Sequence, residues 1–320
     1  MKRTFLLIIA LSFFWAISMS VRAAVPAQLQ RMKIAYSSIS PIFAGIWIAK
    51  EKGLFEKYGL RTDLVYIGSG SVAVQAMVGG EVDMVGGAGN AVVGAILHGA
   101  PLISVGCVSN AAAMILWVQP EISKPEQLQG KVLGISRHGS ATHYLTLVAL
   151  EKLGLKDKVA LQALGGAPET DASFRAGLIA GAVRSVKPDP KARSLADLTD
   201  LKISFPMDLF AVHRDLYKNS TKTVESMLKA YIEGIAILRT RKSEAMDVLK
   251  KYLRRNDVQE AYDYGYKYLE RTARVDPAGI QTVLAWEGKS DIPGNRFFDN
   301  AIVDKLVQEG FVDGLYKGGQ

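Results

Sequence analysis

Residues 34–54 read IAYSSISPIFAGIWIAKEKGL, and residues 132–155 read VLGISRHGSATHYLTLVALEKLGL. In both segments a short apolar strand leads into a turn rich in serine or glycine, and an apolar helix follows. The two segments align without a gap at Ile34 with Ile135 and at Gly53–Leu54 with Gly154–Leu155. A second strand, turn and helix follow each segment, so the sequence predicts two similar α/β units. The alternative is a chance similarity between tandem strand–helix units.

Each unit places a polar turn between the carboxyl end of a strand and the amino end of a helix. Open α/β sheets bind small ligands at this edge, and the unpaired N–H groups of a helix start favour anions. Hydroxyl groups there also cap ordinary helices, which is the alternative role. The turns contain Ser37, Ser38 and Ser40, then Gly87, Ala88 and Asn90, then Gly139, Ser140 and Thr142. If these turns converge, we expect them to hold a small anionic or strongly accepting ligand through neutral dipoles.

Catalytic groups are scarce in this sequence. His138 and His143 are five residues apart on a turn and a helix start, which is not the i, i+4 spacing of a helical metal pair. Cys107 is the only cysteine and lies in an apolar strand, where we expect it to be a small buried residue. We therefore expect no enzyme activity, no cofactor and no metal. The alternative is an exported enzyme that uses His138 or His143 as a base.

The first residues have the features of an export signal. Lys2 and Arg3 precede the apolar run FLLIIALSFFWAISM, and small side chains follow at Val21 and Ala23, so we expect residues 1–23 to be cleaved. The apolar run is shorter than the ~20 residues of a spanning helix, which disfavours the alternative of an uncleaved anchor. Cleavage would remove three cations and lower the formal charge from +8 to +5. The remaining cations are dispersed, so we expect a periplasmic protein that binds no nucleic acid.

The chain is long enough for two cores, since it has 320 residues, of which 49% are hydrophobic. Two extended segments, 102–120 and 202–215, are longer than a usual strand of ~5–6 residues. We expect each to carry the chain between two lobes, with residues 32–112 plus 210–320 in lobe 1 and 113–209 in lobe 2. Beyond Asn219, apolar residues recur at helical spacing, which predicts a helical C-terminal region.

Five segments in this order resemble the substrate-binding proteins of ABC importers of the nitrate/sulfonate/taurine class. They are SPIFAGIWIAKEKGLFEKYGL from Ser40, GGEVDMVGG from Gly79, LQGKVLGISRHGSATHYLTLVALEKLGL from Leu128, LGGAPETDASFRAGLIAGAV from Leu164 and FFDNAIVDKLVQEGFVDGLY from Phe297. The resemblance implies the type 2 periplasmic binding protein fold, in which two α/β lobes, each a sheet flanked by helices, close over a ligand. Many of these relatives carry an acid where Gly181 stands, which makes the expected cleft of this chain more basic or neutral.

The resemblance also implies a function and a site. We expect a monomer that captures a small polar or anionic molecule, such as a sulfonate, nitrate, taurine or a pyrimidine, and delivers it to an ABC permease in the membrane. A sensory ligand-binding module is the alternative. On the pattern of the family, Ser38, Ser40, Ala88, Asn90, the turn from His138 to Thr142 and the strand end at Arg184–Ser185 would line the cleft. The ligand contacts that we select are Ser38, Ser40, Phe43, Ala88, Asn90, His138, Gly139, Ser140, Thr142, Arg184 and Ser185, with Phe43 or Trp47 covering the apolar part of the ligand.

Overall fold

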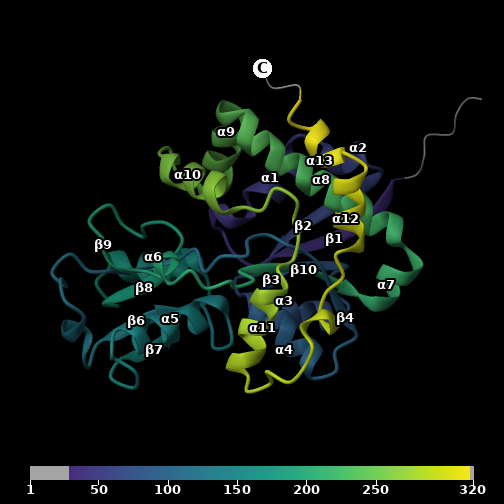
Figure 1. Cartoon of the computed structure of the whole chain (residues 1–320). Coiled ribbons are helices and arrows are strands. Elements are labelled where there is room, and N and C mark those ends of the chain that lie inside the picture. Colours follow the sequence, from purple (N-terminus) through teal and green to yellow (C-terminus); the bar gives the residue numbers. More distant parts are fainter. Residues whose placement is uncertain (1–28, 318–320) are drawn as a thin grey trace, which may run out of the picture.

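The computed structural model describes residues 29–317 and contains two five-stranded sheets, each flanked by helices (Figure 1). The first sheet has the strand order β2-β1-β3-β10-β4, and the second has the order β7-β6-β8-β5-β9. We call the first sheet with its helices lobe 1 and the second lobe 2. The strands of lobe 1 are β1 (Gln30–Tyr36), β2 (Leu60–Tyr66), β3 (Met84–Ala88), β4 (Leu102–Cys107) and β10 (Asp208–His213). The strands of lobe 2 are β5 (Ile115–Val118), β6 (Val132–Ile135), β7 (Ala160–Ala163), β8 (Gly181–Arg184) and β9 (Arg193–Asp197).

Helices alternate with strands in the first two thirds of the chain and then follow one another. In lobe 1 they are η1 (Pro41–Phe43), α1 (Ala44–Glu51), α2 (Leu54–Lys57), α3 (Gly70–Val78) and α4 (Gly89–Leu97). In lobe 2 they are η2 (Pro125–Leu128), α5 (Ala141–Lys152), α6 (Ala167–Arg175) and η3 (Leu198–Leu201). The C-terminal region adds α7 (Arg214–Asn219), α8 (Thr221–Thr240), α9 (Lys242–Leu253), α10 (Gln259–Tyr268), α11 (Pro277–Trp286), η4 (Gly294–Arg296), α12 (Ala301–Gln308) and α13 (Phe311–Gly314).

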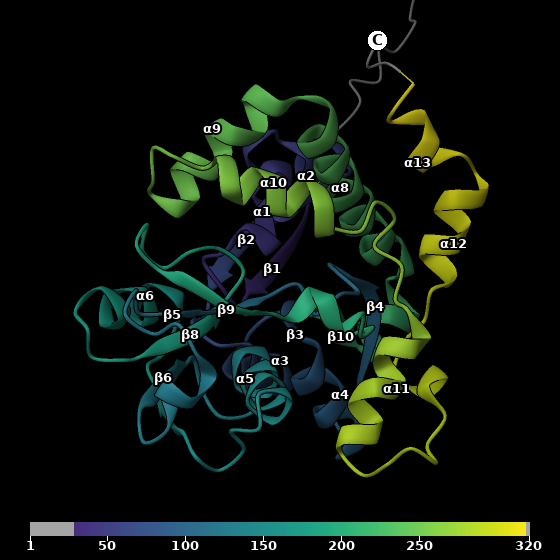
Figure 2. The ribbon, with the colours of Figure 1, turned by 60° about the vertical axis from the view of Figure 1, so that its left-hand side comes forward.

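The strand orders confirm the repeat predicted from the sequence. In each sheet the second strand of the order, β1 or β6, pairs in parallel with both of its neighbours. The fourth strand, β10 or β5, is antiparallel to its neighbours. The aligned residues Ile34 and Ile135 therefore lie on equivalent strands. The turn after β1 contacts the end of β8, and the turn after β6 contacts the start of α4. Figure 2 shows the two lobes from a second direction.

Two chain segments connect the lobes and run side by side. Residues 108–114 lead from β4 to β5, and residues 198–207 lead from β9 back to β10. Phe205 N donates to Asn110 O and Met207 N donates to Ser109 O, each at 3.0 Å. Two adjacent crossings of this kind are typical of a hinge between two lobes. Both predicted crossings are therefore present, although the predicted lobe boundary after residue 209 falls inside β10.

The sequence did not predict β9, which follows the proline-rich loop at residues 188–190. This strand is five residues long and partly exposed, so it shows neither a long apolar run nor a clear alternation. It pairs antiparallel with β5 and completes the correspondence between the two sheets.

The predicted export signal over residues 1–23 lies outside the described residues. Within residues 29–317, every helix is too short or too polar to cross a bilayer.

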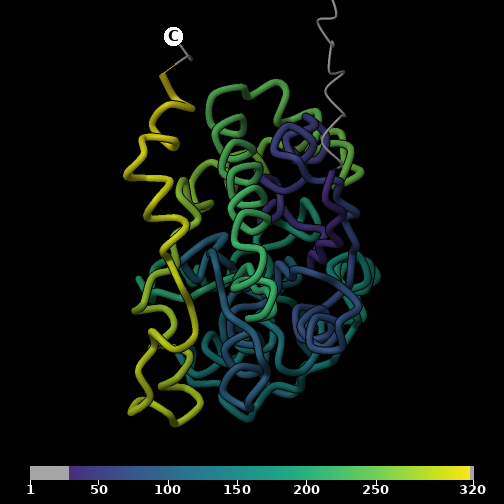
Figure 3. The backbone as a smooth tube through the Cα atoms, turned by 90° about the vertical axis from the view of Figure 1, so that its right-hand side faces the viewer, coloured from purple at the N-terminus to yellow at the C-terminus, as the bar shows by residue number. Residues whose placement is uncertain are grey.

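The C-terminal helices complete lobe 1. The predicted apolar stripe of α8 is fully buried and comprises Val224, Met227, Leu228, Tyr231, Ile232 and Ile235. α8 packs against α1 and α2, and the segment from α11 to α12 passes along the outside of lobe 1 (Figure 3). There, Ser104 N donates to Phe297 O at 3.1 Å, so this segment is bonded to the edge strand β4. The helical region therefore holds lobe 1 together, and it also contacts lobe 2, because Trp286 stacks on Tyr144 and Arg255 pairs with Asp171.

We expect Gly234→Ala to lower the free energy of unfolding by about 1–3 kcal/mol, because overpacking a tight contact carries a cost of this size. α8 and α1 approach so closely that a methyl group at residue 234 would overlap the carbonyl oxygen of Gly45. Urea denaturation measures the change. Gly94→Ala on α4 is the matched control, since its methyl group would contact nothing, and it is expected to stabilise the fold slightly. Equal effects of the two substitutions would contradict the close helix contact.

Candidate functional site

The polar turns of the two lobes contact each other at Asn90–Gly139, Ser40–Ser185 and Ser71–His138, and we call this set of contacts the seam. Asn90 Nδ2, at the start of α4 in lobe 1, donates to Gly139 O in the turn before α5 at 2.8 Å. Ser40 Oγ and Ser185 Oγ lie 2.8 Å apart, and Ser71 Oγ is 3.5 Å from the carbonyl oxygen of His138. The turns that the sequence singles out therefore converge, and lobe 1 is in direct contact with lobe 2.

Two buried polar atoms at the seam have no hydrogen-bond partner among the described residues. They are Tyr66 Oη at the end of β2 and Asn90 Oδ1. Tyr66 Oη lies between the glycine turns of both lobes, since a Cβ atom added at Gly166 would be 2.5 Å from it and one added at Gly68 would be 3.2 Å away. Burial raises the pKa of Tyr66 to about 12, so its phenol keeps the proton and can donate it in a hydrogen bond. Because buried polar groups are nearly always paired, these two atoms are suited to a ligand that offers both an acceptor and a donor.

The hydroxyl groups of the turn before α5 are bonded within that turn. Ser140 Oγ donates to Arg137 O at 2.7 Å and accepts from His143 N at 3.2 Å, so Ser140 caps α5. Thr142 Oγ1 lies 3.0 Å from Ser136 N and accepts its hydrogen bond. Ser140 and Thr142, which we selected as ligand contacts, therefore have a structural role that holds the turn against the seam.

The two histidines of this turn contact each other and a backbone N–H group. Their rings stack edge to face with centroids 5.0 Å apart, and His143 Nδ1 accepts a hydrogen bond from Gly139 N at 3.2 Å. Burial and the neighbouring His138 lower the pKa of His143, so its imidazole is neutral at pH 7. His138 is exposed at the rim of the seam. In the region between residues 29 and 317, no three histidine, cysteine or acidic side chains are grouped to hold a metal ion.

Phe43 and Trp47 lie in the core of lobe 1. Both are completely buried, and the Trp47 ring stacks on Tyr252 at a centroid distance of 4.8 Å. In this conformation neither ring presents surface to a ligand, contrary to the sequence prediction. Ala88 is also buried, at the end of β3, and packs against Gly70 at the start of α3. Ser38 is half-buried in the turn after β1.

Beneath this turn lies Asp208, a buried acid that sequence reasoning missed. Asp208 is the first residue of β10, opposite Ala88, and Ser37 Oγ donates to its Oδ1 at 3.1 Å. Burial raises the pKa of Asp208 to about 7, and the hydrogen bond from Ser37 lowers it only in part. The sequence carries no signal for this contact, because residues 37 and 208 approach only when β10 inserts beside β3.

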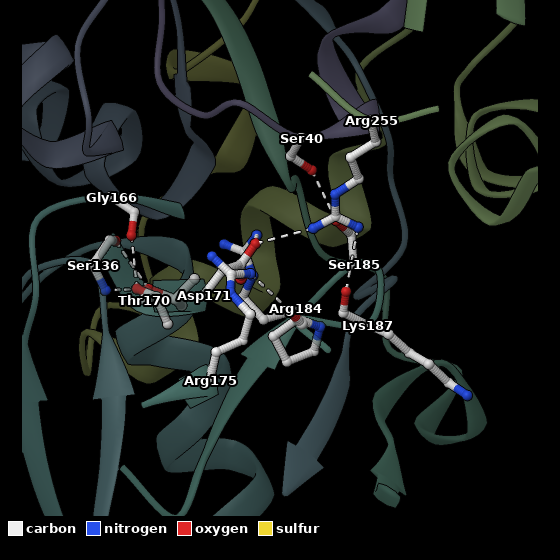
Figure 4. A network of polar contacts seen from close by, with 12 residues as sticks. Ser40, Ser136, Gly166, Thr170, Asp171, Arg175, Arg184, Ser185, Lys187 and Arg255 are labelled. Carbon is white, nitrogen blue, oxygen red and sulfur yellow. Dashed lines mark hydrogen bonds and ion pairs between the residues drawn. The ribbon is translucent and has the colours of Figure 1, made fainter. Parts of the chain in front are cut away.

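Beside the seam lies a cavity of about 410 Å³ that contains an unexpected group of charges. Its charged lining residues are Arg175, Arg184, Arg254, Arg255 and Asp171, and we call it the arginine cavity. Figure 4 shows these residues except Arg254. Of these, only Arg184 was selected from the sequence. The others come from α6 and from the loop after α9, and only the folded chain brings them together. The neutral dipoles expected from the sequence are thus accompanied by several guanidinium groups.

Asp171 is the centre of this group. Arg184 Nε lies 3.1 Å from Asp171 Oδ1, as an ion pair rather than a well-aligned hydrogen bond, and Arg184 Nη2 donates to Oδ2 at 3.3 Å. Arg255 Nη2, which comes from the other lobe, donates to the same oxygen at 3.2 Å. Burial raises the pKa of Asp171, while Arg184 and Arg255 oppose that rise. The Asp171–Arg255 contact therefore joins lobe 2 to lobe 1 next to the seam.

We compared the sequence and the fold of this chain with known proteins. The family model described as NMT1/THI5 like matches residues 40–245, whereas no curated protein sequence matches. A solved structure from Bordetella bronchiseptica RB50 has a TM-score of 0.77 at 18% identity and covers 87% of this chain and 97% of its own. The alkanesulfonate-binding protein of Xanthomonas axonopodis pv. citri, bound to MOPS, has a TM-score of 0.71 at 18% identity, with coverages of 86% and 99%. The periplasmic nitrate-binding protein of Synechocystis PCC 6803 has a TM-score of 0.67 at 12% identity, with coverages of 88% and 89%. These likenesses confirm the predicted two-lobed periplasmic binding protein fold.

Proposed function

Because the chain belongs to the NMT1/THI5-like family and has the two-lobed periplasmic binding protein fold, we propose that it is a solute-binding protein of an ABC importer. The observation that carries the proposal is the pair of unpartnered buried atoms, Tyr66 Oη and Asn90 Oδ1, at the seam. They lie where a small molecule would contact both lobes. A ligand shifts a hinged protein toward its closed state only through such contacts with both halves.

The seam supports reversible capture of a polar or anionic molecule. α3, α4, α5 and α6 all begin along it, so their free backbone N–H groups add positive potential. Lobe 1 and lobe 2 touch there through the Asn90–Gly139 and Ser40–Ser185 contacts, which can open as a unit when the hinge moves. Opening would release the solute to a membrane permease, and the proposal places the protein in the periplasm as a monomer.

The chemistry of the site favours binding over catalysis. His143 is neutral and its Nδ1 accepts a hydrogen bond from a backbone N–H, and within residues 29–317 no carboxylate is hydrogen-bonded to it. Cys107 is completely buried, and burial raises the pKa of its thiol well above the ordinary value, which makes it a poor nucleophile. An exported enzyme would need a nucleophile or an activated base at the seam, and neither His143 nor Cys107 is suited to these roles.

We expect Asn90→Ala to weaken solute binding about two- to tenfold, because the substitution removes the Asn90–Gly139 hydrogen bond that joins the two lobes, and one hydrogen bond contributes about 0.5–1.5 kcal/mol. A thermal-shift screen against nitrate, sulfonates, taurine, pyrimidines, aromatic acids and bicarbonate identifies the solute. A ligand at 100 times its Kd adds about 2.7 kcal/mol to the stability. Calorimetric titration of the variant with that solute then measures the loss.

Asn295→Ala is the control for this substitution, since Asn295 is exposed in η4 at a distance from the seam. The control is expected to bind like the native chain. Unchanged affinity in Asn90→Ala would remove the seam from the binding site, and turnover of a substrate without saturable binding would overturn the receptor function itself.

A further inference from the structure

We propose that the solute is a small organic dicarboxylate and that the arginine cavity binds at least one of its carboxylate groups. The inference deepens the proposed function and rests on it. Four guanidinium groups and one carboxylate line the cavity, so the lining carries an excess of three positive charges. A neutral solute would leave that excess uncompensated in a partly enclosed space. One carboxylate group of the solute would compensate the part of it that nearby acids leave.

Asp171 shows which anion the guanidinium groups accommodate. Arg184 approaches the Asp171 carboxylate side-on through Nε and Nη2, at 3.1 and 3.3 Å from Oδ1 and Oδ2. Arg255 contacts Oδ2 from the opposite lobe at 3.2 Å. The planar fork of a guanidinium group matches the two oxygens of a planar carboxylate. The cavity thus already holds one carboxylate, supplied by the protein, in the geometry that a second carboxylate would use.

The N–H groups of Arg175 and Arg255 that do not contact Asp171 donate to neutral backbone oxygens. Arg175 Nη1 donates to the carbonyl oxygen of Pro188 at 3.2 Å, and Arg255 Nη1 donates to that of Lys187 at 3.5 Å. Both acceptors are neutral, so they satisfy the hydrogen bonds without cancelling the charge. The acids nearby line an adjoining hollow, whose charged residues are Arg175, Arg255, Lys187, Asp189, Asp257 and Glu260. The two hollows share Arg175 and Arg255, so their linings together carry five cations and four acids, and one positive charge remains uncompensated.

The rest of the arginine cavity suits a carbon skeleton. Ile39, Val186, Leu253 and the ring of Tyr252 line it between the charged groups. Tyr252 is held in place, because it stacks on Trp47 and its Oη donates to Glu51 Oε1 at 3.0 Å. An apolar pocket wall with a few fixed polar groups is typical of sites for small organic molecules.

Residues that line the cavity are neighbours in sequence of residues at the seam. Ile39 lines the cavity and is followed by Ser40 at the seam, while Ser185 at the seam lies between Arg184 and Val186 in the cavity lining. Ser40 Oγ and Ser185 Oγ, 2.8 Å apart, form the border. A dicarboxylate can therefore place one group in the arginine cavity and direct the other toward the helix starts of the seam.

The test is a calorimetric titration of the full chain with four probes of related structure. Phthalate carries two carboxylates on a ring, benzoate carries one, benzamide carries none, and inorganic phosphate is a dianion without a carbon skeleton. We expect phthalate to bind at least about tenfold more tightly than benzoate, and benzamide not to bind. Tighter binding of phosphate than of phthalate would overturn the inference in favour of an inorganic anion site.

The contribution of the cavity is tested with Arg255→Gln and, independently, with Arg175→Gln. Each is expected to weaken phthalate binding by about tenfold or more, since a hydrogen bond between charged groups contributes about 1.5–3 kcal/mol. Arg61→Gln on β2 removes the same charge at a position that does not line the cavity and is expected to leave the affinity unchanged. Circular dichroism and thermal melting confirm that the variants fold.

Two outcomes separate this inference from the proposed function. If a neutral solute or nitrate binds, and Asn90→Ala weakens that binding while Arg255→Gln does not, the dicarboxylate inference is wrong and the receptor function stands. If neither phthalate nor any molecule of the wider screen binds, both are wrong. Equal loss of phthalate affinity in Arg61→Gln and Arg255→Gln would also overturn the role of the cavity, because it would indicate a general effect of net charge.

Discussion

Asp171→Ala is expected to lower the free energy of unfolding by about 3–5 kcal/mol, the usual effect of removing one partner from a buried ion pair. Arg184 is 7% exposed, and Asp171 is the partner that compensates its charge. Without the carboxylate, the guanidinium group remains buried and unpaired in lobe 2. The Asp171–Arg255 contact between the lobes would be lost as well. Urea denaturation of the native chain and the variant measures the change.

A double variant distinguishes the buried charge from other consequences of the substitution. Asp171→Ala combined with Arg184→Met removes both charges, and we expect it to recover part of the lost stability. Phthalate is expected to raise the melting temperature of Asp171→Ala by more than that of the native chain, because its carboxylate would replace the missing one. If the double variant is no more stable than Asp171→Ala, the ion pair is not the cause of the loss.

Asp208→Asn is expected to stabilise the protein by up to about 4 kcal/mol at pH 8 and to have little effect near pH 4. Burial raises the pKa of this carboxyl group from 3.8 to about 7 in the folded chain. The folded state therefore binds the proton more tightly than the unfolded state, and stability falls as the pH rises from about 4 to about 7. Above pH 7 the full destabilisation by the buried charge is present. Asparagine carries no charge and can still accept the hydrogen bond from Ser37.

Urea denaturation between pH 4 and pH 8 measures the difference between native and variant protein. Asp63→Asn on β2 is the control, since Asp63 is exposed and its substitution is expected to change the profile little. A difference between native protein and Asp208→Asn that does not depend on pH would contradict the raised pKa of Asp208. If the variant is less stable than the native chain at pH 8, the Ser37–Asp208 contact favours the ionised carboxylate.

The sequence predicts the parts of this fold that depend on local patterns. The alignment of Ile34 with Ile135 anticipated two equivalent sheets, because each strand–turn–helix unit is encoded within about thirty residues. The apolar stripe of α8 anticipated a buried face for the same reason. The two crossings were visible as extended runs too long for a single strand. β9 was not visible, because a short, half-exposed strand has almost no periodic signal.

The site was predictable only where it lies on those local turns. Ser40, Asn90, Gly139 and Ser185 were selected from the sequence, and the structure brings them together at the seam. Their role as ligand contacts remains a prediction. The pairs Asp171–Arg255 and Ser37–Asp208 were missed, since each joins residues far apart in the chain through the order of strands and the packing of α9. Phe43 was misplaced, because an aromatic residue near a polar turn has the same sequence pattern whether it faces the core or a ligand.

The most direct test of solute capture between the lobes is a calorimetric titration of the native chain with the solute found in the thermal-shift screen. The solute is then recovered and analysed by mass spectrometry. We expect one solute to bind per chain, to be recovered chemically unchanged, and to lose affinity in Asn90→Ala but not in Asn295→Ala. Chemical conversion of the solute, or binding that Asn90→Ala leaves intact, would contradict the account.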